Sequence, residues 1–376
     1  MLDPEFMLER PWYKKLNYAL VIATLALSLY GIIVIKSATL HLPGAQSDVK
    51  HQIAYLIFGA VAMIVLTFVD YHLWQKLAWP LYAVNVAMLA LVALVGHSAL
   101  GAQRWISVGP IVFQPSEPAK LLTTLCVAAI LANPKRSFTR LRDLIFPIAA
   151  VAIPVALVIK QPDLGTALVL VVIFSAMLFF ALPNFAHFLA YGAGLAAGAF
   201  ALTSSPLLKG YQRQRLLAFL NPKHDPQGAG WSLIQAKIAV GSGELAGKGL
   251  YQGTQTQLGF VPTHETDFIF TVVGEELGFL GALALLGLYA LALGAGMAVI
   301  VTARDKFGLF VAAGIVAMLA FHILVNVGMT IGIMPITGIP LPFISYGGSS
   351  LVTCLMAVGV MLNIHLQRDK LSFLTS

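Results

Sequence analysis

Long runs of apolar residues follow one another along the chain and constrain its fold more than any other feature. A helix needs about 20 mostly apolar residues to cross the hydrocarbon core of a bilayer, and about ten such runs are present. The fourth and fifth runs are the shortest. The predicted spans are Leu16–Ile35, Gln52–Val69, Leu77–Val95, Pro118–Leu131, Leu144–Ile159, Leu164–Leu182, Phe185–Leu202, Leu277–Val301, Gly308–Ile331 and Ser350–Leu366.

The composition excludes most water-soluble classes of protein. Of the 376 residues, 59% are hydrophobic and only 10% are charged, whereas an average soluble domain is roughly 25% charged. A soluble globule of this size has too little interior to bury so much apolar surface. We therefore expect an all-α, polytopic membrane protein with about ten transmembrane helices, rather than a soluble enzyme, a nucleic-acid-binding module or a disordered chain.

The net charge of +7 fits a membrane better than a nucleic acid. The cations lie mostly in loops, and no basic run is interleaved with aromatic residues, so no nucleic-acid partner is expected. Anionic membrane lipids or an anionic lipid-linked substrate would account for the charge. Lys and Arg gather in short loops on the side of the two termini, which the positive-inside rule assigns to the cytoplasm. These cations are Arg10, Lys14, Lys15, Lys76, Lys135, Arg136, Arg140, Arg142, Arg304, Lys306, Arg368 and Lys370.

The chain divides into a short leader and a single transmembrane domain. Residues 1–6 precede a second methionine, Met7, and read as residues left by a cloning vector. Residues 7–376 form the domain, and residues 203–266 form one large extracytoplasmic loop. Loops of this length usually carry function. Within it, Gly210–Leu220 is either an interfacial helix or a helix that merely covers the loop, and the sequence leaves both open.

Three carboxylates lie where predicted segments begin on the extracytoplasmic side. These are Glu117, Asp163 and Asp267. One interpretation is that each acid only caps a helix and complements the helix dipole. The other is that several helix N-termini open on one face and together suit a phosphate group. Ser349, at the start of the tenth span, belongs to the same face.

Four cations would strengthen such a phosphate site. They are Arg104, Lys120, Lys237 and Lys248. Three of them lie in loops, where a solvated surface role is the simpler interpretation. Lys120 follows Glu117 by three residues on a helical pattern, so the two can form an ion pair. That pair either holds the helices together or holds Lys120 in place for an anion.

Asp267 differs from the other acids because it directly precedes an apolar run. A carboxylate at a partly dehydrated rim has a raised pKa, and such a group can take a proton from a sugar hydroxyl. The alternatives are a helix cap at Thr266 or Asp267, or a catalytic role for Glu275 or Glu276. The run from Asp267 to Val301 is too long for one span, so we expect a separate short helix over Asp267–Glu276 with a break near Gly278.

The proline-rich segment Gly338–Ser345 is not expected to be helical, because each proline lacks a donor N–H and crowds the preceding turn. Irregular backbone at membrane depth must be buried in protein or line a cavity, so this segment forms either a cavity wall or a plain turn. The sequence contains no Walker loop, no dinucleotide fingerprint and no His/Cys metal cluster. A nucleotide cofactor is therefore not expected, and no metal ligands can be assigned.

The ordered motifs resemble those of the SEDS family (shape, elongation, division and sporulation), over nearly the whole length after Met7. Departures are Glu265, where the family often has a histidine, and Glu244–Lys248, where it often reads Gly-Leu-Phe-Gly-Lys. Leu164 favours the elongation branch over the division branch. The segments that carry the resemblance are Arg104–Ile106, Phe113–Glu117, Gln161–Ala167, Gln235–Gly243, Thr266–Gly278 and Pro335–Ser349.

The resemblance implies a peptidoglycan glycosyltransferase of the bacterial cytoplasmic membrane. Such proteins polymerise lipid II on the outer face of that membrane and work with a class B penicillin-binding protein, a transpeptidase. By the match of motifs, the essential acid of the family falls on Asp267. Glu117 and Lys120 match its buried pair, and Asp163 matches a functionally sensitive position. The expected substrate-binding set is Arg104, Glu117, Lys120, Asp163, Lys237, Lys248 and Ser349.

If the substrate is lipid II, an α-linked diphosphate leaves and a β-1,4 linkage forms, which a single inverting displacement explains. Asp267 would act as the base, cations and helix N-termini would stabilise the diphosphate, and Mg²⁺ or Mn²⁺ could help to neutralise it. A lipid II flippase is the alternative, because Glu117 and Lys120 also suit translocation. A non-catalytic scaffold for the transpeptidase is the third possibility.

Overall fold

The computed structural model describes residues 12–41, 45–95, 97–99, 102–108, 111–203, 215, 218–221 and 228–368. The six residues assigned to a cloning vector lie outside these ranges. Of the expected interfacial helix at Gly210–Leu220, only residues 215 and 218–220 are described, and they are helical.

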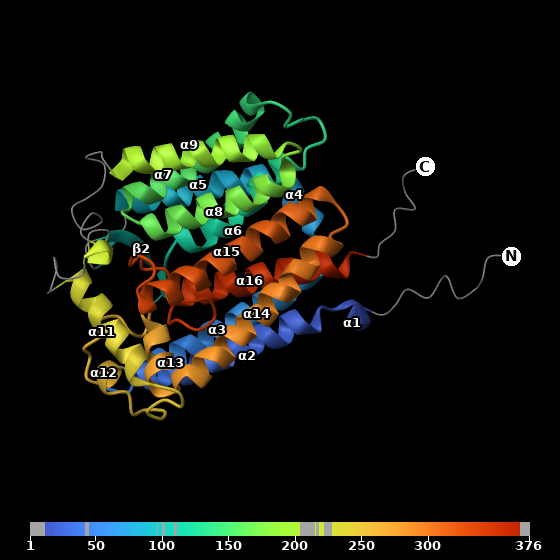
Figure 1. The fold of residues 1–376 in the computed structure, drawn as a ribbon. Coiled ribbons are helices and arrows are strands. Elements are labelled where there is room, and N and C mark those ends of the chain that lie inside the picture. The colour runs from blue at the N-terminus through green and yellow to red at the C-terminus, as the bar shows by residue number, and fades with distance from the viewer. Residues whose placement is uncertain are drawn as a thin grey trace.

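Each of the predicted apolar runs forms a helix, which confirms the expected all-α membrane fold. By length and hydropathy, 7 helical segments qualify as membrane spans, with Ile269–Thr302 counted as one. The runs on α5, α6 and α9 fall outside that group but lie alongside the others (Figure 1). The ten helices are α2 (Tyr18–Ala38), α3 (Ala45–Phe68), α5 (Ala78–Val95), α6 (Ser116–Leu131), α7 (Ile145–Lys160), α8 (Leu164–Ala181), α9 (Phe185–Thr203), α14 (Gly278–Thr302), α15 (Lys306–Ile331) and α16 (Gly348–Leu366).

The helix α15 joins two groups of helices. Figure 1 shows α5 to α9 on one side and α2, α3, α14 and α16 on the other. The helix packs against α6 and α8 of the first group and against α14 and α16 of the second. In accordance with this central place, 72% of its most apolar window is buried. Polar side chains on α15 therefore lie in the interior rather than in lipid.

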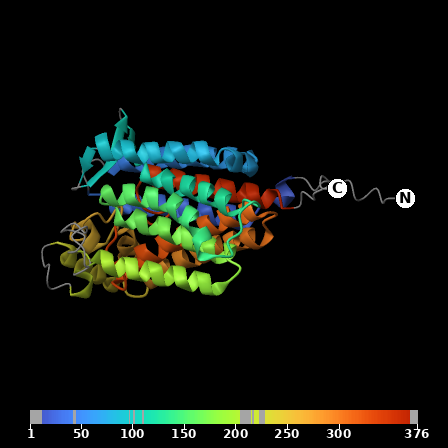
Figure 2. The same ribbon diagram turned by 90° about the horizontal axis from the view of Figure 1, so that it is seen from above.

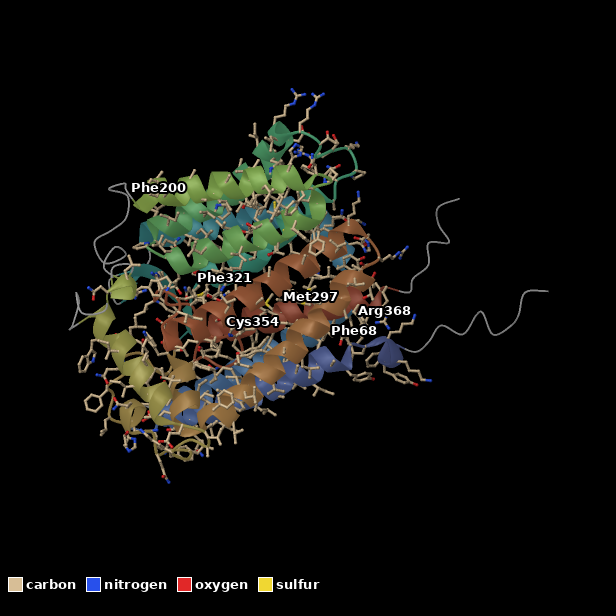
Figure 3. The ribbon with its side chains drawn as sticks, viewed as in Figure 1. Phe68, Phe200, Met297, Phe321, Cys354 and Arg368 are labelled. Carbon is tan, nitrogen blue, oxygen red and sulfur yellow. The ribbon has the colours of Figure 1, made fainter. Side chains whose placement is uncertain are left out.

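The outer surface of the helix bundle is apolar, as a bilayer requires. Figure 3 shows Phe68, Phe200 and Met297 on this surface, and the side chain of Phe200 is 75% exposed. In contrast, Cys354 lies inside the bundle (Figure 3) and is buried and unpaired, as expected of an inert packing residue. Large exposed apolar side chains over many helices are costly in water and favourable in lipid.

The two ends of the bundle differ, and we name them by what they carry. The terminal end holds α1 (Trp12–Lys15), α4 (Tyr71–Lys76), the 3₁₀ turn Leu141–Leu144 and the end of α16. There the Arg368 side chain donates to the carbonyl of Lys15 at 3.3 Å. The loop end holds α11 (Ala229–Ser242), α12 (Thr254–Gln257) and α13 (Ile269–Glu276), as Figures 1 and 2 show. The helix α11 was not foreseen within the long loop.

A small antiparallel sheet at the loop end was also not foreseen. Its strands are β1 (His97–Ala99), β2 (Ala102–Val108) and β3 (Ile111–Phe113), in the order β1-β2-β3. Ala99 pairs with Ala102, and Val108 pairs with Ile111. The sheet lies between α5 and α6, and β2 presents Arg104 at the loop end.

The long apolar segment after Asp267 breaks where it was expected to break. The helix α13 ends at Glu276, and α14 begins at Gly278, which has a φ of 65°. A Cβ at this glycine would lie 2.3 Å from the backbone nitrogen of Gly247, so a side chain does not fit there. The start of the short helix was predicted two residues too early. It begins at Ile269 rather than Asp267, and Asp267 lies in the preceding turn.

Candidate active site

Asp267 does not cap the helix that follows it. The residue at the N-cap of α13 is Phe268, and no side chain caps this end. The cap interpretation of Thr266 and Asp267 therefore fails, and the carboxylate of Asp267 is left for another role. It lies against the irregular segment that follows α15. A Cβ at Gly338 would be 3.2 Å from Oδ2 of Asp267 and 3.4 Å from Nη1 of Arg215.

The surroundings of Asp267 make its carboxyl group a weaker acid. Burial raises its pKa to about 6, while Arg215 and then Arg104 oppose this shift and Glu265 and Asp163 add to it. Asp267 is half-buried, so desolvation destabilises its ionised form while nearby cations stabilise it. The result is a group that is largely ionised at neutral pH yet basic enough to accept a proton, as a general base requires.

Arg215 is the residue of this site that sequence reasoning missed. It lies in the stretch that was interpreted only as an interfacial helix, Gly210–Leu220, far from Asp267 along the chain. Its guanidinium and the Asp267 carboxylate share the surface of Gly338. The sequence shows two arginines in the run QRQR. No pattern among neighbouring residues, however, indicates which acid an arginine in a long loop will face.

Asp163 caps a helix and also lies near a cation. Its carboxylate caps α8 by accepting hydrogen bonds from the Thr166 nitrogen at 3.2 Å and hydroxyl at 2.9 Å. It also lies 3.7 Å from Nη1 of Arg104, and Arg104 donates to the carbonyl of Pro162. At Gly165, a Cβ would be 3.1 Å from the Thr337 carbonyl. The start of α8 therefore lies beside the segment that contacts Asp267.

Glu117 and Lys120 form the ion pair that their spacing predicts. The Lys120 ammonium is 2.8 Å from the Glu117 carboxylate, and both side chains are almost fully buried. The ammonium also donates to Nε2 of His322 on α15 at 3.0 Å, while Nδ1 of His322 lies 2.7 Å from the Met318 carbonyl. The three side chains join α6 to α15 inside the bundle. Lys120 therefore has fixed partners inside the bundle, about one turn after the start of α6.

Ser349 connects two helix starts. Its hydroxyl accepts a hydrogen bond from the backbone nitrogen of Gln114 at 3.1 Å, and the Gln114 side chain donates to Ser116 at 3.0 Å. This places the beginning of α16 beside the beginning of α6.

The other two predicted cations lie apart from each other. Lys237 is exposed on α11, and its side chain packs against Gly332 at the end of α15. Lys248 forms an ion pair with Glu275 at 2.7 Å and donates to the Thr254 hydroxyl at 2.8 Å. The geometry therefore gives Lys248 a fixed partner about two helical turns beyond Asp267.

Glu275 and Glu276 hold the long loop onto α13 rather than compete with Asp267. Both are buried. Glu275 accepts hydrogen bonds from the backbone nitrogens of Gln255 and Thr256, at 2.8 and 3.0 Å. Glu276 accepts from the Ser37 hydroxyl, from the Tyr251 nitrogen and from the Gln257 side chain. These bonds tie α13 to the long loop and to the end of α2.

The place of Lys248 leads to a first prediction. Changing Lys248 to Met removes one charged hydrogen bond from Glu275 but leaves its backbone donors, so we expect a loss of about 1–3 kcal/mol of unfolding free energy. Thermal unfolding in detergent measures this loss. The KM for a lipid-linked donor should change less than threefold. A tenfold rise in KM with unchanged stability would instead assign Lys248 to the substrate.

The acids of the site do not fit a resident metal ion. Asp163 is used by Arg104 and Thr166, and Asp267 faces two guanidinium groups. Among the residues that the structure describes, no group of three or more His, Cys, Asp or Glu side chains could hold a metal. Divalent cations prefer several oxygen ligands without competing cations, so we derive no step from a metal bound by these residues.

Comparison with known proteins places the chain in a family. The FtsW/RodA/SpoVE family, described as "Cell cycle protein", matches residues 18–370. The chain belongs to this family. It is 37% identical over 357 residues to the peptidoglycan glycosyltransferase MrdB of Escherichia coli K12, with 95% of each chain covered. Membership in this SEDS family and the apolar helices identify an integral protein of the bacterial inner membrane.

Two solved structures extend this likeness to the fold. One is from a study of the structural coordination of polymerization and crosslinking by a peptidoglycan synthase complex. It has a TM-score of 0.81 at 32% identity and covers 94% of this chain and 99% of that one. The other is the rod shape determining protein RodA of Thermus thermophilus. It has a TM-score of 0.71 at 30% identity and covers 97% of this chain and 99% of that one.

Proposed function

We propose that this protein is a peptidoglycan glycosyltransferase that polymerises lipid II into linear glycan strands. The single observation that supports this most is the setting of Asp267. Its carboxylate does not cap a helix, and its pKa is raised to about 6 beside two guanidinium groups. The helix that follows it, α13, lies at the loop end of a membrane bundle. A base next to cations is what transfer from a lipid-linked diphosphate needs, and the peptidoglycan glycosyltransferase MrdB is a relative.

The loop end is the extracytoplasmic end in this proposal, and both termini are cytoplasmic. The described parts nearest the two termini, α1 and the end of α16, lie together at the other end. The basic loop with Arg140 and Arg142 also lies there, beside the start of α7, as the positive-inside rule requires. A lipid-linked sugar would reach Asp267 from the outer leaflet, with its acyl tail along the apolar helices.

The chemistry proposed is one inverting displacement. Asp267 takes the proton from the acceptor sugar hydroxyl as the hydroxyl oxygen attacks the anomeric carbon of the donor. The bond between that carbon and the diphosphate oxygen breaks, and the diphosphate leaves with its electron pair. Arg215 and Arg104 stabilise the departing charge, because arginine presents several donors to phosphate oxygens. An α-linked donor then gives a β-linked product.

The partner proposed is a class B penicillin-binding protein that crosslinks the new strand. The likeness to a chain from a peptidoglycan synthase complex, studied for its coordination of polymerization and crosslinking, supports this partner.

A lipid II flippase is the second candidate, and one observation favours it. Glu117, Lys120 and His322 form a charged cluster inside the bundle, and such groups often mark a transport path. Lys120 is bonded to both of the others, however, and it is only 2% exposed. A transported headgroup would need them free, so polymerisation is the better account.

Proteoliposomes with lipid II test the two functions against each other. Purified protein is reconstituted with fluorescent lipid II, and strand formation is measured by gel electrophoresis while transbilayer movement is measured by quenching of outer-leaflet label. Polymerisation predicts strands of many disaccharides and no movement above protein-free vesicles. Rapid movement without strands would contradict the proposal and favour the flippase.

Arg215 provides a prediction of its own. Changing Arg215 to Gln removes a cation from beside the leaving diphosphate, and we expect a fall of roughly 10²-fold in kcat. It also removes the cation that most lowers the pKa of Asp267, so the acidic limb of the pH–rate profile should move to higher pH. Changing Arg215 to Lys should restore part of the rate. A limb that stays in place would show that Arg215 does not face Asp267.

A further inference from the structure

The backbone carbonyls of three consecutive residues, Glu265, Thr266 and Asp267, each accept a hydrogen bond from a distant part of the chain. The carbonyl of Glu265 accepts from the Tyr346 nitrogen at 3.0 Å, and that of Thr266 accepts from the Ser345 hydroxyl at 2.7 Å. The carbonyl of Asp267 accepts from the side-chain amide of Asn326 at 2.8 Å. Helix α15 and the segment after it thus fix the turn in which Asp267 lies.

Asn326 makes the most specific of these contacts. It lies on α15, and none of its surface is exposed. Its amide nitrogen donates to the carbonyl of Asp267 and to that of Ile339, both at 2.8 Å. The reversed amide would place its oxygen against two carbonyl oxygens, so the bonding fixes its orientation. Its Oδ1 is buried without a hydrogen-bond partner among the described residues.

The unpaired oxygen has a cost that the two bonds of the amide must offset. A buried acceptor with no partner is unfavourable, and proteins retain few of them. An apolar residue at this position would remove the unpaired oxygen but would leave the carbonyls of Asp267 and Ile339 without this donor. Asn326 retains it while both of its amide hydrogens go to backbone carbonyls, one of them that of the acid.

The segment bound by Asn326 is itself anchored to other helices. The Tyr289 hydroxyl on α14 donates to the carbonyl of Pro342 at 2.6 Å. On α3, the Gln52 side chain donates to the carbonyl of Ser345 and accepts from the Gly347 nitrogen, both at 3.3 Å. Hydrogen bonds therefore connect the turn of Asp267, through Asn326 and the segment after α15, to the helices α15, α14 and α3.

We propose that Asn326 is a positioning residue that holds Asp267 in its enclosed, base-competent place by binding the Asp267 carbonyl. This inference rests on the proposed function of Asp267 as the base. Without the Asn326 amide, the turn is free to move, and the carboxylate approaches either water or Arg215. Both favour the ionised form.

The pH dependence follows from the groups that face the acid. These are Arg215, Arg104 on β2, Glu265 in the same turn and Asp163 at the start of α8. Burial is the largest influence on Asp267 and raises its pKa. Without the hydrogen bond from Asn326 to the Asp267 carbonyl, the carboxylate becomes less buried, so its pKa falls. The acidic limb of the pH profile of kcat therefore moves to lower pH.

The test compares Asn326→Leu with a matched control, Asn363→Leu. Asn363 is also a buried asparagine, and it donates to the Thr67 carbonyl at 2.8 Å and accepts from the Tyr71 nitrogen at 2.9 Å, but at the terminal end. Both variants lose similar bonds, and thermal unfolding reports how much each is destabilised. Ser345→Ala loses the hydroxyl that donates to the Thr266 carbonyl and accepts from the Leu341 nitrogen, and it serves if Asn326→Leu does not fold.

We expect Asn326→Leu to lower kcat by roughly 30-fold with KM changed less than threefold, and to move the acidic limb down by roughly one pH unit. Asn363→Leu should lose stability while its limb stays in place. Ser345→Ala should show a smaller shift in the same direction. If Asn326→Leu, or Ser345→Ala in its stead, keeps the wild-type limb, the proposal is overturned, whether or not activity falls.

A readout without turnover separates this inference from the proposed function. Infrared difference spectra, with the Asp267→Asn protein as reference, give the pKa of Asp267 directly. A lower pKa in Asn326→Leu supports the positioning role even if the wild-type protein does not polymerise lipid II. An unchanged pKa overturns the positioning role even if the wild-type protein does polymerise it.

Discussion

Changing Asp267 to Asn is expected to lower the rate of glycan polymerisation by roughly 10²- to 10⁴-fold, the usual contribution of a general base. The amide has nearly the same shape as the carboxylate but cannot accept the proton of the attacking hydroxyl. Because Asp267 does not cap α13, the variant should fold normally, with an unchanged thermal unfolding temperature. The KM for lipid II should change little, since cations rather than this acid bind the diphosphate.

Glu265 provides the matched control for Asp267. It lies in the same turn and, like Asp267, is partly exposed, but its carboxylate lies 3.8 Å from Nδ1 of His264, whereas Asp267 lies with Arg215 against Gly338. Changing Glu265 to Gln should leave the rate within about threefold and lower the pKa of Asp267 slightly, because a repelling charge is lost. If Asp267→Asn keeps more than a tenth of the wild-type rate, Asp267 is not the base.

Changing Lys120 to Met is expected to destabilise the protein by about 3–5 kcal/mol, because Glu117 is left as a buried, unpaired charge. The pair is 2.8 Å apart inside the bundle, where neither group can be solvated. Changing Glu117 to Gln alone leaves the buried Lys120 ammonium without its negative counter-charge, and a similar loss follows. Thermal unfolding in detergent and the yield of folded protein measure both effects.

The double variant decides between the two roles that the sequence left open for this pair. With Glu117→Gln and Lys120→Met together, no buried charge remains, so most of the lost stability should return. If the pair is structural, as the burial of Lys120 favours, polymerisation should return to within about tenfold of wild type. A double variant that is stable but inactive would instead assign Lys120 to the bound diphosphate.

Local patterns in the sequence predicted the spans, the break near Gly278 and the pairing of Glu117 with Lys120. Each of these depends on residues that are neighbours along one helix, where apolar runs and three-residue spacing determine the structure. The irregular backbone of Gly338–Ser345 was predictable for the same reason, since its prolines exclude a helix. The break also needs a glycine, and the close backbone of Gly247 explains it.

Contacts between distant segments were not predictable. Arg215 faces Asp267 from a stretch about 50 positions earlier in the sequence, and no local pattern pairs them. The helix α11 was missed because the long loop around it is rich in glycine, glutamine and proline, which indicate irregular structure. The small sheet was missed because two of its strands have only three residues. Asn326 did leave a signal. It is a polar residue inside an apolar span, and such residues are usually functional, but its two carbonyl partners lie in other segments.

The pH dependence of kcat for lipid II polymerisation tests the central claim most directly. The base must be ionised to act, so the rate should be low below the pKa of Asp267, rise with pH through about 6 and reach a plateau near neutrality. The residual activity of Asp267→Asn should lack this limb. A wild-type limb near the ordinary pKa of an aspartate, about 4, or a limb near 6 that survives in Asp267→Asn, would contradict the account.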